Sequence, residues 1–583
     1  MTVFVPPLPE IRFVLREIAG IERLATLPGL AHATPDLLDA ALEEAGKFAA
    51  EVLAPLNAVG DRHGAVLENG VVRTAPGFKE AYRTFREGGW TGVVFPEAYG
   101  GQDLPWTFNT ALADLWNAAN MTFEICPLLT RGAVEAILHH GSEAQKRLYA
   151  TRLISGEWTA AMCLTEPQAG TDLGALRTRA EPRDGHWRLF GQKIFITFGD
   201  HDMAENIVHL VLARLPDAPP GTKGISLFIV PKYLPGPDGR PGPRNDWRVL
   251  KLEHKVGIHA SPTCVIAYGE EEGAVGFLLG EPHRGLACMF TMMNNARLAV
   301  GHEGLGLSER AFQAALAWAR TRIQGRIDGR PAPILAFPDV RRMLVRMRAQ
   351  IAAMRALCYW TGSFVDRAAR AADPAERRRA ADRVALLTPV VKAWCTDLAQ
   401  EVTHGAIQVH GGMGFVEETG VAQHWRDARI LPIYEGTNGI QAIDLVGRKL
   451  AMADGRLPWD LVDELRADLD TVPGELRLSL RQGLERFEAA TRYVQGASEE
   501  HKGAAAAAYL RLFGHTLGAF LLARGARAAA AGATGGEAWP GLARFWCAHL
   551  LPETLGLLAS VSAGAEGLDP ALLDERASTV PIS

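Results

Sequence analysis

Two kinds of residue pattern alternate over three successive regions of this 583-residue chain, and their order constrains the fold more than any single motif does. Up to about Leu153, apolar residues recur every three or four positions, which is typical of amphipathic helices. From Trp158, short runs rich in β-branched and aromatic residues are separated by Gly, Pro and Asp, as in strands joined by turns. After Gly285 the helical period returns and persists. We therefore predict a mainly α protein with a middle β domain.

Breaks in this pattern divide the chain into segments. A chain of 583 residues is longer than the chains that usually fold around one hydrophobic core, so several domains are expected. The Gly/Pro-containing stretch from Asp454 to Pro458 is typical of a linker, and helical texture resumes at about Trp459. The predicted segments are an N-terminal extension (1–33), an N-terminal helical domain (34–157), a middle β domain (158–280), a helical bundle (281–450) and a C-terminal helical extension (459–583).

Local signals place some elements in more detail. Thr34 suits the cap of a helix whose first position is Pro35. Pro389 should kink a long helix in the bundle, and the Pro/Gly-rich stretch Pro231 to Arg244 should be a surface loop or a hairpin. The expected strands of the middle domain are Trp187 to Phe190, Lys193 to Phe198, Ile207 to Leu212, Ile225 to Val230 and Thr263 to Tyr268.

Composition argues against several classes of function. A net charge of −5 offers no overall attraction for nucleic acid. The sequence shows neither a signal peptide at its start nor an uncharged apolar window of the length of a membrane span. Its 7 cysteines include no CxxC pair, so neither a zinc site nor a disulfide framework is indicated and no metal is expected. We therefore expect a cytoplasmic protein with reduced thiols, no nucleic-acid partner and no membrane span.

Two stretches of the middle region suit a phosphate-bearing or planar ligand. In Cys163 to Asp172, Pro and Gly expose backbone amides that can hold a phosphate, helped by the Thr171 hydroxyl. Gly191 to Thr197 is a predicted strand in which Phe195 can stack on a planar group and the Thr197 hydroxyl can bond its edge. Taken alone, the first also suits an ordinary turn and the second a plain strand.

Two further stretches lie in the second helical region. The glycines of His404 to Phe415 end a long helix and leave amides for an anion or an adenine edge. In Ile433 to Gln441, Glu435 lies beside backbone that glycine makes accessible, and Ile433 and Tyr434 should shield it from water and raise its pKa towards that of a useful base. The alternative is a solvated carboxylate at the positive end of a helix dipole. The chain has neither a GxGxxG after a strand nor a GxxxxGK[ST], so a dinucleotide must bind in another fold.

Taken together and in this order, the four stretches resemble the acyl-CoA dehydrogenase family over roughly Thr34 to Leu450. The segments that look like family motifs are the turn from Gly92 to Gly101, the Thr-Glu-Pro segment, Phe195-Ile196-Thr197, the Gly-Gly segment and Tyr434-Glu435-Gly436-Thr437. The resemblance implies an α-helical domain, a β-barrel-like domain and a four-helix bundle, with non-covalent FAD between the last two.

The same resemblance implies roles for single residues. Glu435 would take the α-proton of an acyl-CoA thioester while the β-hydrogen leaves as hydride to FAD, giving a trans-2-enoyl-CoA. Within one subunit FAD would contact Leu164, Thr165, Gly170, Thr171, Phe195, Thr197 and Thr437. Across a subunit interface it would contact Arg322, Gln324, Gln408, Gly411 and Gly412. The substrate would contact Thr171, Arg297, Tyr434 and Gly436, with a surface ion pair as the alternative for Arg297.

Departures from the family pattern also carry information. Gly325 stands where the family usually has Phe, and Gly439 where Gln or Glu is common. The start of the chain, Phe4 to Phe13, and the region after Pro458 resemble a longer bacterial branch that includes 3-(methylthio)propanoyl-CoA dehydrogenases and broad-range fatty acyl-CoA dehydrogenases. By analogy, the added domain covers the surface used for tetramers and favours a homodimer.

The resemblance thus predicts an FAD-dependent acyl-CoA dehydrogenase that passes electrons to an electron-transfer flavoprotein. Its substrate would be 3-(methylthio)propanoyl-CoA or a fatty acyl-CoA. Two alternatives stay open, an acyl-CoA oxidase-like flavoprotein and a stress-response relative that binds nucleic acid without dehydrogenase activity. The acidic net charge and Glu435 argue against the second. The length of the acyl chain depends on helix packing, which the sequence does not give.

Overall fold

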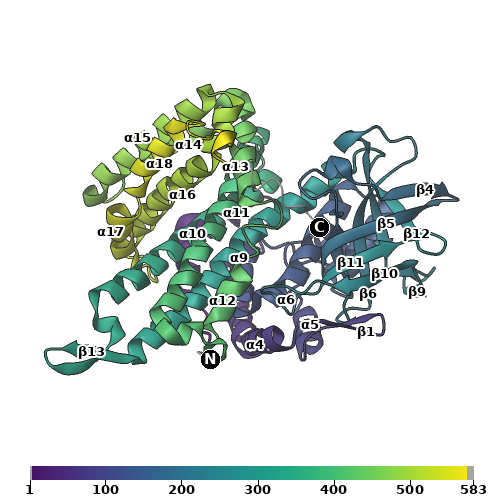
Figure 1. The fold of residues 1–583 in the computed structure, drawn as a ribbon, viewed down its shortest axis with the longest axis horizontal. Helices are drawn as coiled ribbons and strands as arrows, with labels where there is room; N and C mark the ends of the chain where they lie inside the picture. The colour runs from purple at the N-terminus through teal and green to yellow at the C-terminus, as the bar shows by residue number, and fades with distance from the viewer. Residues whose placement is uncertain (1–2, 574–583) are drawn as a thin grey trace.

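A computed structural model describes residues 3–573. In Figure 1 a β-rich body lies on one side, long helices occupy the centre, and the C-terminal helices form a layer on the other side. The predicted order of helical, β and helical regions is confirmed.

The N-terminal region is helical apart from one small hairpin. The Thr34 hydroxyl accepts a hydrogen bond from the Leu37 amide at 3.3 Å and caps the helix that begins at Pro35, as predicted. The longest helix of this region, α6, is broken at Asn120, where φ is −161° and ψ is 87°. The elements are α1 (Leu8–Phe13), a π-helical turn (Val14–Ala19), α2 (Ile21–Leu24), α3 (Pro35–Phe48), a second π turn (Ala49–Leu53), α4 (Ala54–His63), β1 (Val66–Glu68), β2 (Val71–Arg73), α5 (Phe78–Glu87), α6 (Trp106–His140), α7 (Glu143–Gln145), a third π turn (Lys146–Ala150) and α8 (Thr151–Ile154).

The middle region is a closed, barrel-like sheet. Its strands are β3 (Trp158–Cys163), β4 (Arg179–Arg183), β5 (His186–Thr197), β6 (Asn206–Arg214), β7 (Ile225–Pro231), β10 (Trp247–Leu252), β11 (Thr263–Tyr268) and β12 (Ala274–Leu279). They follow the order β10-β11-β5-β12-β7-β6-β3, and β4 pairs with both β5 and β6, which closes a ring. Two predicted strands merge into β5, while β3, β4, β10 and β12 were not predicted. The expected excursion is a hairpin of β8 (Tyr233–Pro235) and β9 (Pro241–Arg244).

The bundle consists of three long helices and two shorter ones. They are α9 (Gly285–Thr321), α10 (Pro338–Arg370), α11 (Pro374–His410), α12 (Val421–Ala428) and α13 (Asn438–Gly447). Helix α9 packs against α6, α10 and α11. Helix α11 runs through Pro389 as one continuous helix, and a kink at this proline stays a prediction. A hairpin of β13 (Ile323–Ile327) and β14 (Arg330–Pro333) projects from the end of α9 away from the rest of the chain (Figure 1).

The C-terminal layer contains α14 (Leu457–Asp468), α15 (Gly474–Gly496), α16 (Glu499–Ala530), α17 (Trp539–His549) and α18 (Glu553–Ala563). The preceding break is marked by left-handed backbone at Ala453, Asp454 and Gly455. Among the helices of residues 3–573, α16 alone is long and apolar enough to cross a membrane by length and composition, although Arg511 and Arg524 interrupt its apolar residues, so the expectation of no long uncharged window still holds. Most of its apolar window is buried, because it packs against α13, α17 and α18.

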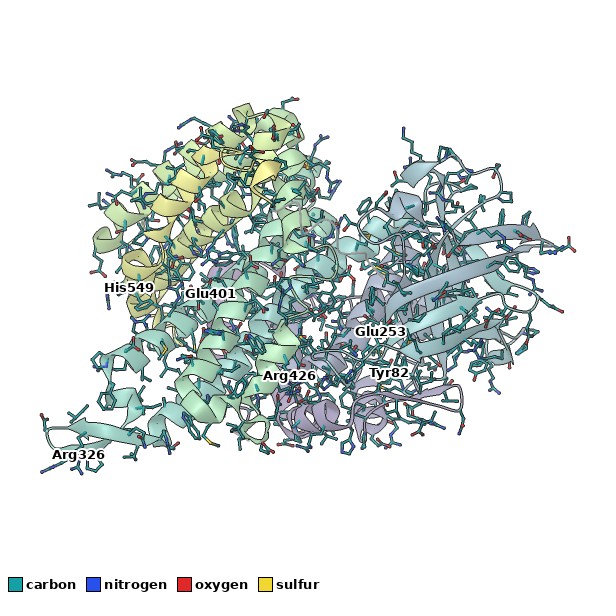
Figure 2. All side chains as sticks on the ribbon, viewed as in Figure 1. Tyr82, Glu253, Arg326, Glu401, Arg426 and His549 are labelled. Atoms are coloured by element: carbon teal, nitrogen blue, oxygen red, sulfur yellow. The ribbon has the colours of Figure 1, made fainter. Side chains whose placement is uncertain are left out.

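Polar contacts fasten the outer segments to the bundle. The Trp394 indole donates to His515 Nδ1 at 2.9 Å, and Arg511 donates to Glu401 at 2.7 Å. Figure 2 shows Glu401 where the bundle meets the C-terminal layer. In the N-terminal extension, the buried Glu10 carboxylate lies 3.1 Å from Arg355 of α10. Both extensions are therefore integral parts of the same packed molecule.

Candidate active site

A chamber of about 180 Å³ lies between the β domain and the bundle. It is lined by segments that are far apart in the sequence: α6, β3, the loop after β3, β5, α9 and the loop before α13. The predicted site residues that line it are Leu164, Thr165, Gly170, Thr171, Phe195, Thr197, Arg297, Glu435 and Gly436. The other lining residues are Leu129, Met162, Leu173, Ile196, Met293 and Ile440.

A β-bulge shapes the side of the chamber that β5 forms. In the pairing with β11, Ile196 lies opposite Cys264 and Lys193 opposite Ile266, so Ile194 and Phe195 together face one residue. Phe195 has φ of 58° and its side chain is 60% exposed. The bulge turns the ring out of the sheet, so β5 is not the plain strand that its sequence also allowed. A planar ligand can stack on such a ring.

A buried ion pair between Lys193 and Glu166 anchors the loop after β3. Lys193 Nζ donates to Glu166 Oε1 and to the Leu164 carbonyl, each at 2.8 Å. The main-chain amides of Arg177 and Thr178 donate to the same carboxylate at 2.7 and 3.0 Å. Burial alone would raise the pKa of Glu166, but the charge of Lys193 and these donors lower that pKa to about 2. The main chain of Leu164 is thus held in place at the chamber wall.

The loop that carries Glu435 has strained backbone. Glu435 has φ of 57° and Gly436 has φ of 84°, a left-handed pair that glycine tolerates and glutamate does not favour. The Glu435 carbonyl accepts hydrogen bonds from Gln441 Nε2 at 3.2 Å and from Arg297 Nε at 3.4 Å. Thr437 then caps α13, since its hydroxyl accepts from the Ile440 amide at 3.2 Å. These contacts hold the Glu435 backbone in a conformation that a free chain would avoid.

The first residue of α13 is tied to α11 through its side chain. Asn438 Nδ2 donates to Asp397 at 2.7 Å and to the Thr396 hydroxyl at 2.9 Å. Asn438 Oδ1 accepts from Lys392 Nζ at 2.8 Å. The position of the Glu435 loop therefore depends on α11 as well as on its own sequence.

Burial raises the pKa of Glu435 to about 7, and the charges of Arg297 and Lys392 oppose the increase. The predicted direction of the shift is thus confirmed, and the solvated-carboxylate alternative is not supported. The expected role of Ile433 as a shield is wrong, because that side chain is 46% exposed. None of the hydrogen bonds found within residues 3–573 ends on the Glu435 carboxylate, which leaves it available to accept a proton.

Family models match four consecutive parts of this chain. They are the acyl-CoA dehydrogenase N-terminal domain (36–157), middle domain (161–269) and C-terminal domain (283–450), and a C-terminal-like domain described for acetyl-CoA dehydrogenase (461–568). The chain belongs to the acyl-CoA dehydrogenase family. It is therefore an oxidoreductase that acts on acyl-CoA, in a family of flavoproteins.

Individual relatives support this assignment. The chain is 49% identical over 456 residues to 3-methylmercaptopropionyl-CoA dehydrogenase of Ruegeria pomeroyi, covering 77% of each chain. It is 33% identical to the broad-specificity linear acyl-CoA dehydrogenase FadE5 of Mycobacterium tuberculosis, covering 97% of this chain and 98% of the relative. A Bacillus anthracis acyl-CoA dehydrogenase solved with FAD shares the fold, with 22% identity, a TM-score of 0.73 and coverage of 94% of this chain and 91% of that one. The resemblance of the extended chain to a longer branch is thus confirmed.

Several residues predicted for the site of this acyl-CoA dehydrogenase lie elsewhere in the chain. Arg322 and Gln324 are exposed at the projecting β13–β14 hairpin, far from the chamber; Figure 2 marks Arg326 on it. Gln408, Gly411 and Gly412 are exposed at the end of α11. Their contacts with FAD across a subunit interface stay predictions. Gly325, the departure from the family's Phe, has φ of 77° at an irregular point of the hairpin, a conformation that suits glycine.

The remaining predictions concern residues beside the catalytic loop. Arg297 is buried and lines the chamber, so the alternative interpretation of Arg297 as part of a surface ion pair is wrong. The Tyr434 hydroxyl bonds the buried Glu303 carboxylate of α9, and Tyr434 is not among the chamber-lining residues. Sequence reasoning missed Glu303 and the Glu166–Lys193 pair. The sequence does contain an indication that Glu303 is unusual, because it is a charged residue in the apolar, glycine-rich stretch Leu298 to Leu307.

Proposed function

We propose that this protein is an FAD-dependent acyl-CoA dehydrogenase in which Glu435 is the catalytic base. The observation that carries the proposal is that Glu435 lines the chamber, that its carboxylate accepts no hydrogen bond from the described residues 3–573, and that burial raises its pKa to about 7. A base with a pKa near the working pH combines a large deprotonated fraction with strong proton affinity. The α-proton of a thioester is weakly acidic, so both properties are needed.

The chamber wall on the β side fits a flavin. Phe195 offers an exposed ring, and the hydroxyls of Thr165 and Thr197 lie on the same wall. Gly170 faces open space, because a side chain placed there would meet nothing within 4 Å, which lets a ligand approach the main chain. Leu164, Thr165, Gly170, Thr171, Phe195 and Thr197 would hold FAD here. When bound, FAD supplies the acceptor for the hydride that leaves the β-carbon.

The other residues of the chamber assist Glu435. Leu129, Met162 and Met293 line the wall with apolar side chains and exclude water from the acyl group. Arg297 and Lys392 keep the pKa of Glu435 from rising further, so that part of the population is deprotonated at neutral pH. Glu435 lines the chamber from a loop whose backbone is held in a left-handed conformation. Proton removal from the α-carbon then gives, with hydride loss, the trans-2-enoyl-CoA.

The finer features of the reaction follow from the same proposal. We propose 3-(methylthio)propanoyl-CoA or a fatty acyl-CoA as substrate and an electron-transfer flavoprotein as acceptor. The name of the Ruegeria pomeroyi relative supports the first substrate. A homodimer is supported by the exposure of Arg322, Gln324, Gln408, Gly411 and Gly412 and by Phe415, which is 90% exposed beside them. A cytoplasmic location is supported by the 7 free, buried cysteines.

The test is an anaerobic titration of the purified yellow protein with butyryl-, octanoyl- and 3-(methylthio)propanoyl-CoA. At least one thioester should bleach the flavin absorbance, and the bleached protein should reoxidise with an electron-transfer flavoprotein and only slowly in air. Rapid peroxide formation in air would instead support the oxidase. A protein that no acyl-CoA bleaches, and that binds DNA in a salt-sensitive manner, would contradict the dehydrogenase proposal.

A further inference from the structure

The loop that carries Glu435 is closed at its base by Asn438, the first residue of α13. The main-chain amide of Asn438 donates to the Pro432 carbonyl at 2.9 Å. These two residues bracket the left-handed backbone of Glu435 and Gly436. A glutamate that is held only from distant points of the chain would relax out of this conformation. The closure of the short loop therefore helps to fix the position of the carboxylate.

The side chain of Asn438 attaches the base of this loop to one turn of α11. Its amide nitrogen donates to the Ala393 carbonyl at 3.1 Å, as well as to Thr396 and Asp397. Its amide oxygen accepts from the ammonium of Lys392. An asparagine side chain both donates and accepts hydrogen bonds, and here both abilities are used. An apolar side chain at this position would make none of these contacts.

The turn of α11 that receives Asn438 is held from another side by the C-terminal layer. Lys392 is 0% exposed, and its neighbour Trp394 donates its indole hydrogen to His515 of α16. A Cβ atom added at Gly514 of α16 would lie 2.3 Å from the Trp394 ring, so only glycine fits at this contact. The support to which the loop is attached is thus itself closely packed.

Lys392 connects the same attachment with the ionisation of the base. Its charge is one of the two that oppose the increase in the pKa of Glu435. Its ammonium donates to Asn438 Oδ1 at 2.8 Å. Loss of that oxygen would leave a buried cation without this acceptor, which is unfavourable. Asn438 therefore contacts both the loop that carries the base and a cation that acts on it.

We propose that Asn438 is a positioning residue for Glu435, which holds the catalytic loop against α11. The inference rests on the proposed function, because it concerns the base of that reaction. Asn438 is not among the chamber-lining residues, so it acts through the backbone of the loop and not by contact with the substrate. A reacting group displaced by about 1 Å can lose about 10²-fold in rate. Loss of the Asn438 side chain should therefore impair proton abstraction far more than substrate binding.

The first test measures flavin bleaching by stopped flow in Asn438→Ala and in the wild type, with the acyl-CoA that bleaches the wild type fastest. At saturating substrate and pH 8.5, where most of Glu435 is deprotonated, the rate should fall about 10- to 100-fold. The substrate concentration that gives half of the maximal rate should change by less than about threefold, because the lost interaction acts on the chemical step. The absorbance spectrum should show that FAD is retained.

The matched control is Asn245→Ala in the β domain. The amide nitrogen of Asn245 donates to the Pro231 and Val275 carbonyls, each at 2.9 Å, and its oxygen accepts from the amides of Val275 and Asp246. Asn245 is not among the chamber-lining residues. Both substitutions should lower the urea midpoint of unfolding, but Asn245→Ala should leave the bleaching rate unchanged.

The second test restores the attachment with donor and acceptor exchanged. Asn438→Asp places a carboxylate against Asp397, so the bleaching rate should fall about tenfold or more. Asp397→Asn alone should bleach at nearly the wild-type rate, because the new amide oxygen still accepts from Asn438. In the double variant Asn438→Asp/Asp397→Asn the amide and the carboxylate have changed places, and the rate should return to within about threefold of the wild type.

The two tests can each overturn the proposal. A folded Asn438→Ala protein that bleaches at the wild-type rate would contradict it, as would equal losses of rate in Asn438→Ala and Asn245→Ala. If Asn438→Ala does not fold, the exchange decides, since a double variant no faster than Asn438→Asp would contradict the proposal. Failure of the proposed function is recognised differently, because then no acyl-CoA bleaches the wild type, or Glu435→Gln bleaches as fast as the wild type.

Discussion

Glu166 anchors the loop after β3 and Glu435 lies in the loop before α13, and burial acts to raise the pKa of each carboxylate. The Glu166 carboxylate accepts hydrogen bonds from Lys193, Arg177 and Thr178, and its pKa is about 2. The Glu435 carboxylate is influenced by Arg297 and Lys392 only through their charge, and its pKa is about 7. The two carboxylates thus differ in pKa because Glu166 accepts several hydrogen bonds, whereas no hydrogen bond found within residues 3–573 ends on the Glu435 carboxylate.

This difference separates a structural acid from a reactive one. A carboxylate that several donors stabilise has little proton affinity at neutral pH and serves to anchor its surroundings. A desolvated carboxylate without donors keeps its affinity for a proton and suits general-base catalysis. The loop after β3 therefore supplies a fixed wall, and the loop before α13 supplies the chemistry.

The largest expected effect is on the rate of turnover, and substitution of Glu435 should cause it. Glu435→Gln should lower the rate of flavin bleaching by about 10²- to 10⁴-fold, because the amide cannot accept the α-proton. The variant should still bind FAD and acyl-CoA, as measured by its absorbance spectrum and by calorimetry. A variant that bleaches at the wild-type rate would remove Glu435 from the mechanism.

The next largest effect is on the free energy of unfolding, and it should result from removing the cation that pairs with Glu166. Lys193→Met leaves the buried Glu166 carboxylate without its cation, which should cost about 3–5 kcal/mol in the free energy of unfolding. A matched control is Lys251→Met in β10, where Lys251 is 62% exposed and pairs with Glu253 at 3.1 Å. The control should cost about 0–1 kcal/mol in urea unfolding. Equal losses for the two variants would show that Glu166 is not an anchor.

A smaller effect is on the pH dependence of stability, to which Glu435 and Glu166 contribute in opposite directions. The folded state raises the pKa of Glu435 from 4.5 to about 7, so it binds a proton more tightly than the unfolded state does. Stability from this group therefore declines as pH rises from about 4.5 through about 7, and Glu435→Gln should be more stable than the wild type by about 1–3 kcal/mol at pH 8 but not at pH 4.5. Glu166 acts the other way, since its stabilisation is lost as pH falls from 4.5 through about 2. Thermal unfolding at both pH values checks the sign, and a Glu435→Gln protein no more stable at pH 8 would contradict it.

The smallest effect tests whether the donors to Glu166 act in a graded manner. Thr178→Val removes one hydroxyl donor, whose distance to Glu166 Oε1 is 2.5 Å, but keeps the Thr178 amide and Lys193. It should cost about 0.5–1.5 kcal/mol in urea unfolding, since one hydrogen bond of several is lost. A cost as large as that of Lys193→Met would mean that the donors act only as a complete set.

The fold was predictable where periodicity is strong. The Thr34 cap, the long helices of the bundle and β11 follow directly from sequence pattern. Strand β4 was missed because it contains charged residues and Pro182 and is largely exposed, so it shows no alternation of burial. Strand β12 was missed because Gly276 interrupts its apolar run. These strands are fixed by their neighbours in the closed sheet.

The site was predictable where a local motif carries it. Glu435 and Phe195 were found in this way and do line the chamber, although the bulge that turns Phe195 outward depends on pairing with β11. The Glu303–Tyr434 contact joins residues 131 positions apart, and nothing local indicates it. The Lys193–Glu166 pair spans 27 positions. Contacts of this kind come from tertiary packing, so a local sequence pattern does not reveal them.

The pH dependence of kcat/KM tests the central claim most directly, because it reports the ionisation of the free enzyme. With the best acyl-CoA substrate, we expect kcat/KM to rise with pH through an apparent pKa near 7 and then to level off. This apparent pKa is the value to which burial raises the pKa of Glu435. An apparent pKa near 4.5, or a flat profile from pH 5.5 to 8.5, would show that Glu435 is not a desolvated base and would contradict the account.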